Sequence, residues 1–244
     1  MKIEEFMELT KYKYLEDSDQ SKGVTQPPLE AEHDPARRTI SLPSPDTLAF
    51  GRSPLIDAIN NRRSVRQYSD IALTLDELAW LLWCTQGVKR TRPGATLRTV
   101  PSAGARHAFE TYLLINRVEG LEPGLYRYLA LEHSLLEATL KPGIAEEVVA
   151  GCLDQGFVAA SAATFLWVAD KKRMEWRYGD RGARYLHLDA GHVCQNLYLS
   201  AEAIESGVCA IAAFDDDEIN RVVGVDGKEQ FVIYVATVGK KQRT

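Results

Sequence analysis

Hydrophobic residues recur at steps of three and four between Gly182 and Gly207, and this spacing predicts one long α-helix. A second hydrophobic set, which includes Leu188 and Tyr198, occupies much of the remaining helix circumference. We expect such a helix to be buried on several sides, inside its own domain or against a second subunit. Gly207 is expected to end it as a left-handed C-cap. The first set consists of Ala183, Leu186, Ala190, Val193, Leu197, Ala201 and Ile204.

Local signals predict three shorter helices. Ser53 followed by Pro54 is an N-cap with proline at the first helical position, which starts one helix. The segment 74–77 (TLDE) is a capping box that starts a second helix, and Gly87 ends it. A third helix is expected over residues 144–153.

Several segments have the length and composition of β-strands. Residues 164–169 form a continuous apolar run, which is typical of a strand covered on both faces. Residues 89–108 are rich in Gly, Pro, Thr and Arg and are interpreted as a loop. The pattern predicts an α+β fold with a central, mainly antiparallel sheet and helices on both faces. The expected strands are 109–115, 124–128, 134–139, 164–169, 208–213 and 231–238.

The N-terminal part of the chain differs from the rest. Residues 17–53 contain several prolines and no sustained hydrophobic periodicity. We interpret residues 1–53 as an extended arm that wraps over its own domain or over a partner, and residues 54–244 as one globular domain.

Composition limits the classes of partner. The chain has 244 residues, of which 45% are hydrophobic and 26% charged, and its formal net charge is -5. This charge gives no general attraction to nucleic acid or to an anionic membrane surface, so neither is an expected partner. The four cysteines are widely separated and no His or Cys spacing fits a metal site, so we predict free thiols and no metal. The N-terminus lacks the pattern of a signal peptide, and we expect a cytoplasmic protein.

Basic residues gather at two places. The first follows the helix after Pro54, where guanidinium groups and a hydroxyl suit a phosphate; the alternative is a solvated basic turn. The second follows the last strand, within residues 238–243, and by itself it is a frayed terminus. If both clusters bind one phosphate, that single ligand accounts for the presence of both. The residues are Arg62, Arg63, Ser64 and Arg66 in the first cluster and Lys240 and Lys241 in the second.

Three further segments bear on chemistry. The loop 99–105 (TVPSAGA) consists of small residues, and it either approaches a flat ligand closely or is simply a tight turn. Residues 210–213 are similar, and the three aspartates at 215–217 are expected to cap the next helix rather than bind metal. Arg177 and Tyr178 precede the long helix, and the tyrosine is either a proton donor or a packing residue. No histidine is assigned a catalytic role.

Together these segments resemble the nitroreductase-type flavoenzymes, and specifically their SagB-type dehydrogenase branch. The motifs RRSVRQYSD, RTVPSAGA, GLYRY, RYGDRGARYLHLDAGHVCQNLYLSAEA, AFDDD and VGKK occur in the order and at the approximate spacing associated with that branch. The resemblance covers roughly residues 54–241. It implies a nitroreductase-like fold in an intertwined homodimer whose two sites, each built from both chains, hold non-covalent FMN.

The resemblance also implies the cofactor contacts. The backbone around Ala212 and Ala213 would face the flavin N5, although the branch usually has Gly at the position of Ala212. The loop at 101–104 would contact the ribityl chain and ring from the other subunit, and the residues after it, 106–108, depart from the aromatic-proline pattern of the branch. The implied phosphate ligands are Arg62, Arg63, Ser64, Arg66, Lys240 and Lys241, and the implied loop contacts are Pro101, Ser102, Ala103 and Gly104.

The first functional hypothesis is an FMN-dependent oxidoreductase that transfers hydride through flavin N5 to or from a small-molecule or peptide substrate. The direction is either oxidation of an azoline in a peptide or reduction of a nitro compound or quinone, with NAD(P)H as a candidate electron donor. The alternative is a non-catalytic flavin-binding or scaffold subunit of a peptide-modification complex. Arg177 and Tyr178, the candidate catalytic residues, align with a Lys-Tyr pair of the azoline oxidases. Arginine stays protonated, so only Tyr178 can act as a proton donor.

Overall fold

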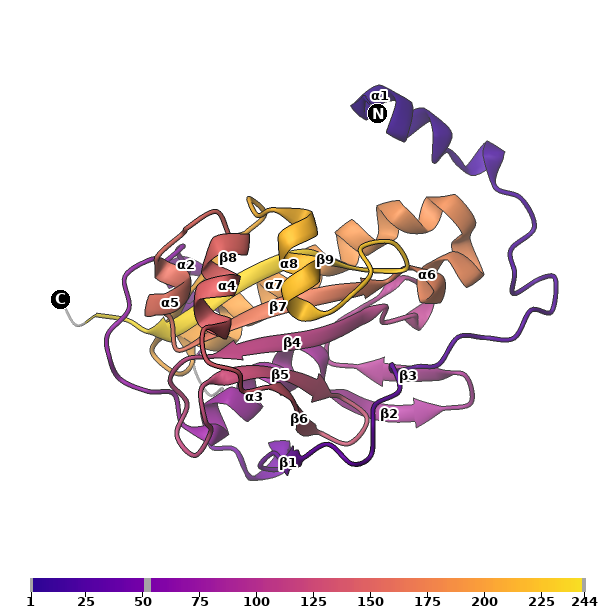
Figure 1. The fold of residues 1–244 in the computed structure, drawn as a ribbon. Helices are drawn as coiled ribbons and strands as arrows, with labels where there is room; N and C mark the ends of the chain where they lie inside the picture. The colour runs from indigo at the N-terminus through magenta and orange to yellow at the C-terminus, as the bar shows by residue number, and fades with distance from the viewer. Residues whose placement is uncertain (1, 51–53, 243–244) are drawn as a thin grey trace.

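The computed structural model of the chain describes residues 2–50 and 54–242. Its centre is a seven-stranded sheet in the order β1-β6-β5-β4-β7-β9-β8, in which every neighbouring pair is antiparallel (Figure 1). The antiparallel sheet and the α+β class are therefore confirmed. The strands are β1 (Thr39–Ser41), β4 (Phe109–Ile115), β5 (Gly124–Leu129), β6 (Ser134–Thr139), β7 (Ala163–Asp170), β8 (Ser206–Ile211) and β9 (Gln230–Lys240).

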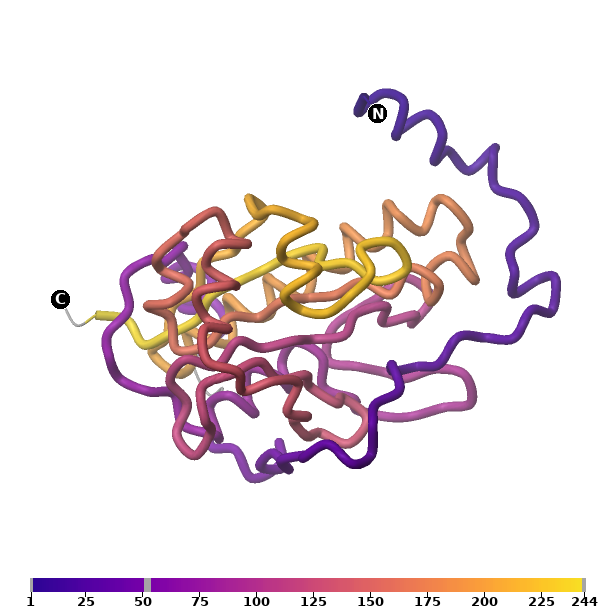
Figure 2. The backbone as a smooth tube through the Cα atoms, in the orientation of Figure 1, coloured from indigo at the N-terminus to yellow at the C-terminus, as the bar shows by residue number. Residues whose placement is uncertain are grey.

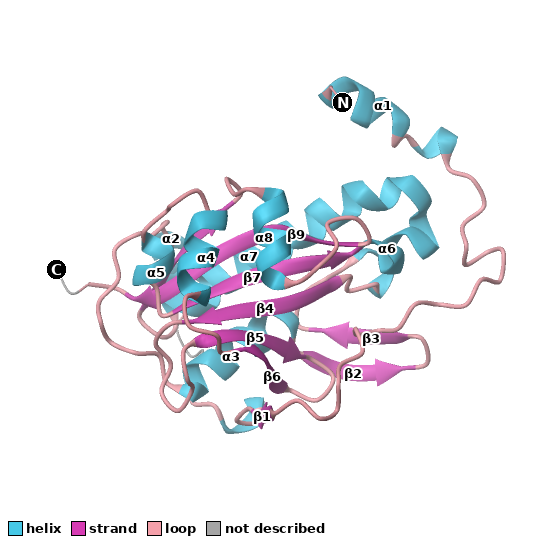
Figure 3. Ribbon diagram, viewed as in Figure 1, coloured by secondary structure: helices cyan, strands magenta, loops and turns pink. Residues whose placement is uncertain are grey.

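Helices cover both faces of this sheet, as the sequence predicted (Figure 3). The central strand β7 shows why: Phe165 and Trp167 pack into the core shared with α3 and α7, whereas Leu166 and Val168 pack into the core shared with α4 and α8. One apolar run in β7 therefore contributes side chains to both cores. The helices are α1 (Ile3–Leu9), α2 (Leu55–Asn61), α3 (Leu75–Gln86), α4 (Ile144–Gly151), α5 (Phe157–Ala160), α6 (Lys171–Tyr178), α7 (Gly182–Glu202) and α8 (Asp216–Val223).

The capping box of α3 is confirmed. The Thr74 hydroxyl accepts the Glu77 N–H at 3.1 Å, the Glu77 carboxylate accepts the Thr74 N–H at 3.0 Å, and the helix ends before Gly87. The predicted N-cap of α2, Ser53, lies outside the described residues, and Pro54 precedes the helix instead of occupying its first position.

The long central helix is confirmed as α7, but its predicted end is wrong. Gly207 does not cap the helix, because α7 ends at Glu202 and Gly207 lies in β8. A Cβ atom on Gly207 would lie 2.5 Å from Cγ2 of Val65, so glycine is needed here because the basic turn packs closely on β8. The chain reverses through Glu205, whose φ is 54°.

Burial of the central helix is incomplete within one chain. Leu188 is 56% exposed, and a Cβ on Gly191 would meet no heavy atom within 4 Å in the described part of the chain. The neighbouring helix α2 likewise exposes Leu55, Ile56 and Ile59. In the described chain, exposed apolar side chains therefore lie on α2 and, with Leu188, on the middle of α7.

The segment predicted as a loop over residues 89–108 contains regular structure. It holds most of an antiparallel hairpin of β2 (Val88–Arg92) and β3 (Ala95–Arg98), with Gly94 at φ 69° in the turn, followed by a short 3-10 helix (Ala103–Ala105). The prediction of a loop was wrong because β2, with the sequence VKRTR, is largely solvent-exposed and carries no apolar alternation.

The N-terminal arm runs along its own domain. The Gln20 N–H donates to the Trp176 carbonyl at 2.8 Å, and the Trp176 indole N–H donates to the Val24 carbonyl at 2.8 Å. Further on, β1 adds to the sheet edge beside β6. The helix α1 contacts α7, because the Arg184 guanidinium donates to the Met7 carbonyl at 3.1 Å. Figure 2 shows the path of the arm from the N-terminus to the sheet.

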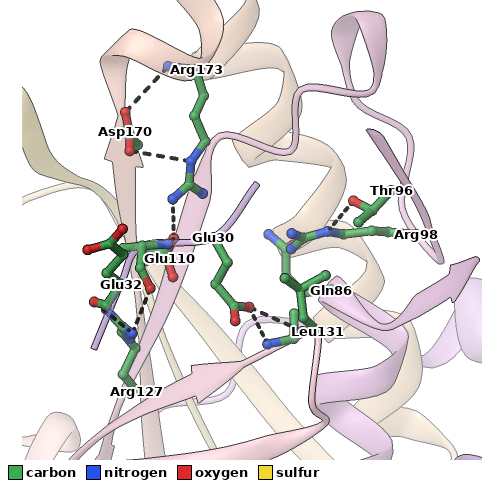
Figure 4. A network of polar contacts seen from close by, with 12 residues as sticks. Glu30, Glu32, Gln86, Thr96, Arg98, Glu110, Arg127, Leu131, Asp170 and Arg173 are labelled. Carbon is green, nitrogen blue, oxygen red and sulfur yellow. Dashed lines mark hydrogen bonds and ion pairs between the residues drawn. The ribbon is translucent and has the colours of Figure 1, made fainter. Parts of the chain in front are cut away.

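A buried polar network joins the arm to the sheet (Figure 4). At its centre Glu110 of β4 pairs with Arg173 of α6, and each side chain is only 3% exposed. The same Glu110 carboxylate accepts the N–H of Ala31 at 2.7 Å, and Asp170 lies 3.3 Å from the Arg173 Nε. Nearby, the Glu30 carboxylate accepts the N–H of Ala130 at 2.6 Å. The ion pair thus ties one strand, one helix and the arm together.

Candidate functional site

The loop of small residues, 99–105, is anchored on the central helix by Asp189. The Ser102 hydroxyl donates to the Asp189 carboxylate at 2.6 Å, and the Ala103 N–H lies 3.2 Å from both carboxylate oxygens. The Ser102 oxygen also accepts the N–H of His107 at 2.9 Å. Asp189 is 4% exposed, and its burial raises the pKa of the carboxyl above its usual value. The Ser102 hydroxyl therefore bonds to other groups of the protein, whereas Pro101 at the start of the loop is exposed to solvent.

The candidate catalytic residues lie against this same loop. Gly104 has φ 55°, and a Cβ there would stand 2.5 Å from the Tyr178 phenol oxygen and 2.8 Å from Cδ of Arg177. Only glycine fits such a contact. The Tyr178 ring packs edge-on against Tyr185, with a centroid separation of 4.7 Å. The structure therefore brings Arg177 and Tyr178 together with the loop 101–104 within one chain.

The basic turn after α2 lines a surface hollow of about 480 Å³. Arg63, Ser64 and Arg66 line it together with Lys241 from the C-terminal segment. Lys241 of the C-terminal basic cluster therefore shares one hollow with three residues of the first cluster, although the Lys241 ammonium also bonds Glu202 at 2.6 Å. A hollow with two guanidinium groups, an ammonium and a hydroxyl suits a phosphate group.

Two predicted phosphate ligands, Lys240 and Arg62, do not line this hollow and contact other residues. The Lys240 ammonium pairs with Glu77 of α3 and donates to the Ile204 carbonyl at 2.7 Å. The Arg62 guanidinium lies over the ring of Tyr198, 5.4 Å from its centroid. Neither contact was visible in the sequence, because Glu77 and Tyr198 belong to helices far from their partners along the chain.

Ala212 and Ala213 follow β8 in the turn before α8, and both are exposed. The Ala213 carbonyl accepts the side-chain amide of Gln155 at 2.8 Å. Asp215 caps α8 as predicted, since its carboxylate accepts the N–H of Glu218 at 2.9 Å. The exposed backbone before this cap is open to a ligand.

Two residues that sequence reasoning missed, Asp189 and Tyr198, organise these groups. Asp189 holds the loop 101–104, and Tyr198 contacts both Arg62 and Ser64. Both lie on α7, nine positions apart, or about 13 Å along the helix axis. The motif DAGH was recognised only as part of the resemblance, and a buried Asp in an otherwise hydrophobic helix was the available signal.

The architecture is that of an α+β domain with a mainly antiparallel sheet covered by helices, and comparison with known proteins identifies its family. The profile of the nitroreductase family matches residues 59–240. A candidate nitroreductase of Methanocaldococcus jannaschii is 36% identical over 187 residues, which cover 77% of this chain and 91% of that protein. The chain therefore belongs to the nitroreductase family, and the recognition made from the sequence is confirmed.

Solved structures show the same fold. A candidate nitroreductase of Anabaena variabilis superposes with a TM-score of 0.71 at 32% identity and 85% coverage, and this chain spans only 42% of that longer protein. The E. coli microcin synthetase McbBCD complex with truncated pro-MccB17 bound contains a chain with a TM-score of 0.63 at 19% identity, covering 88% of this chain and 79% of that one. A candidate nitroreductase of Desulfovibrio desulfuricans in complex with FMN has a TM-score of 0.54 at 15% identity, covering 80% of this chain and 93% of that one.

In the part of the chain that the structure describes, none of the helices has the length and apolar content needed to span a bilayer.

Proposed function

We propose that this chain is a cytoplasmic, homodimeric, FMN-dependent oxidoreductase of the SagB-type dehydrogenase branch. The observation that carries the proposal is the basic hollow, in which Arg63, Ser64 and Arg66 face Lys241. Family membership supports it, as does the fold neighbour that was solved with FMN. FMN would supply two-electron hydride chemistry through its N5 atom.

The residues of the chain would have separate tasks. Arg62, Arg63, Ser64 and Arg66 hold the phosphate, with Lys241 and Lys240 beside them. The loop 101–104 of the other subunit, fixed there by Asp189, would contact the ribityl chain and the ring system, and the exposed backbone at Ala212 and Ala213 would face N5. Tyr178 holds a proton at its phenol oxygen next to Gly104. Arg177 stays positively charged and can only stabilise negative charge.

Two substrate classes remain consistent with this arrangement. The microcin synthetase neighbour, which was solved with a precursor peptide, supports a peptide substrate. The arginine at position 177 instead favours a reaction without a strong base, such as reduction of a quinone or nitroarene by NAD(P)H, because an arginine does not accept a proton. We propose the second class. The alternative, a non-catalytic scaffold subunit, predicts a colourless protein that takes up no FMN.

Turnover by Tyr178→Phe tests the proposed roles. We expect the wild type to reduce a quinone or nitroarene with NAD(P)H and to oxidise thiazoline peptides slowly. Tyr178→Phe should bind FMN normally but turn over about a hundredfold more slowly, because positioned proton transfer contributes at least that much. Tyr112→Phe, on β4, is the matched control and should keep wild-type turnover. Rapid azole formation that Tyr178→Phe leaves undiminished would contradict both the substrate class and the role of the tyrosine.

The proposed dimer has its own test. A second copy would cover the apolar surface of α2 and α7, where Leu188 and the open position at Gly191 lie. Gly191→Trp should therefore lower the dimer fraction measured by light scattering while the far-UV circular dichroism stays unchanged. The control is Glu146→Trp, since Glu146 is exposed on α4, which covers the opposite face of the sheet from α7. A Gly191→Trp protein that remains dimeric at low concentration would show that the surface is not the interface.

A further inference from the structure

Tyr198 stands between the basic turn and the strand that leads to the predicted flavin contacts. Its phenol oxygen accepts the N–H of Ala210 in β8 at 2.9 Å and lies 3.0 Å from the Ser64 hydroxyl oxygen. These two hydrogen bonds join α7 to a turn 134 residues away in sequence and to the strand beside it. None of the motifs that indicated the phosphate site included this residue.

The three groups form a chain of hydrogen bonds, and an anion bound at Ser64 would select the direction of the link between Tyr198 and Ser64. A backbone N–H can only donate, so Ala210 donates to the Tyr198 oxygen. The phenol proton is then free to go to the Ser64 oxygen, which in turn leaves the Ser64 proton free to point at an acceptor. Ser64 lines the basic hollow, so an anion there is the acceptor that completes the chain. Each link polarises the next, which strengthens the terminal hydrogen bond.

The ring of Tyr198 contacts a second candidate ligand of the phosphate, Arg62. Arg62 lies over its face at 5.4 Å, within the range in which a guanidinium is attracted to an aromatic ring. A side chain held over the ring loses less freedom when it binds an anion. The Tyr198 hydroxyl therefore contacts Ser64 and the Tyr198 ring contacts Arg62, and both residues belong to the same basic cluster.

The backbone of the basic turn does not depend on Tyr198. The Val65 N–H donates to the Val208 carbonyl at 2.9 Å, Ser64 forms a bridge to Val208, and Gly207 packs against the Val65 side chain. These contacts keep the turn on β8 when the phenol hydroxyl is removed. A conservative substitution at position 198 therefore tests the orientation of side chains and not the fold.

We propose that Tyr198 is a positioning residue of the phosphate site, which directs the Ser64 hydroxyl and the Arg62 guanidinium toward the bound anion. The inference rests on the proposed FMN function and deepens it. It assigns a residue of the central helix to recognition of the phosphate, separately from recognition of the flavin ring.

Comparing FMN with riboflavin isolates this effect, because riboflavin lacks only the phosphate. Fluorescence titration of the full chain, stripped of flavin, should show that Tyr198→Phe weakens FMN binding about five- to tenfold, the size expected for one hydrogen bond. Riboflavin affinity should stay at the wild-type value. Tyr198→Leu, which also removes the ring, should weaken FMN binding further. Tyr112→Phe should change neither affinity.

A double variant separates positioning from general destabilisation. In a Ser64→Ala background, Tyr198→Phe should cause little additional loss of FMN affinity, because the hydroxyl acts through Ser64. Equal losses for FMN and riboflavin in Tyr198→Phe, or full additivity with Ser64→Ala, would overturn the inference while leaving the proposed function standing. A wild-type chain that binds no FMN would contradict the proposed function and this inference together.

Discussion

Arg173→Met should lower the free energy of unfolding by about 3–5 kcal/mol, because it leaves a buried carboxylate without its cation. Glu110 and Arg173 are each only 3% exposed, and after the substitution Glu110 would keep the Ala31 N–H as its hydrogen-bond donor. For a chain of this size such a loss corresponds to a fall of roughly 6–20 °C in Tm. Thermal unfolding followed by circular dichroism measures it directly.

Two further variants make this result specific. The same change at an exposed ion pair, Arg221→Met, should leave Tm nearly unchanged, since the side chains of Arg221 and Glu218 are 57% and 37% exposed. Combining Arg173→Met with Glu110→Met should recover much of the loss, because position 110 then no longer carries an unpaired buried charge. If Arg173→Met were as stable as Arg221→Met, the network between arm, strand and helix would not contribute to stability.

The double variant Arg62→Ala with Arg66→Ala should weaken FMN binding by about a hundredfold or more. Each charge-assisted hydrogen bond to a phosphate contributes about 1.5–3 kcal/mol, and the two guanidinium groups belong to one turn. The turn should stay folded, since its backbone is held by β8. Riboflavin affinity should change little. The loss of FMN affinity should be smaller at high salt, because salt screens the attraction between guanidinium and phosphate.

Arg90→Ala with Arg92→Ala provides the charge-matched control. Both arginines are exposed on β2, so the pair removes the same net charge away from the hollow. FMN affinity should stay at the wild-type value in this control. An FMN affinity that is unchanged in Arg62→Ala/Arg66→Ala would place the phosphate elsewhere on the protein.

The sequence predicted the strands well where burial decides the pattern. β7 is apolar on both faces because each face contributes to a separate core, so the run 164–169 was readable without any knowledge of its neighbours. The hairpin of β2 and β3 was missed because its first strand is exposed and basic, and only the turn at Pro93 and Gly94 marked it. The role of Gly207 was misjudged because the need for glycine comes from Val65, 142 positions earlier.

The candidate site was predictable as far as residue type indicates chemistry. Arginines in a turn and glycine in a loop of small residues pointed to an anion and a close approach, and the structure places Arg63, Ser64, Arg66 and Lys241 around one hollow. The supporting residues were harder to predict, because Asp189 and Tyr198 act across long sequence separations. Tyr198 looks like an ordinary member of a hydrophobic helix, and only the charge of Asp189 sets it apart. Their roles depend on tertiary contacts alone.

Titration of the flavin-free chain with FMN tests the central claim most directly. The account predicts saturable quenching of flavin fluorescence at one FMN per chain, with much weaker binding of riboflavin, and a yellow complex that is bleached by a reductant. A chain that stays colourless and binds FMN no better than riboflavin would contradict it and would favour the scaffold alternative.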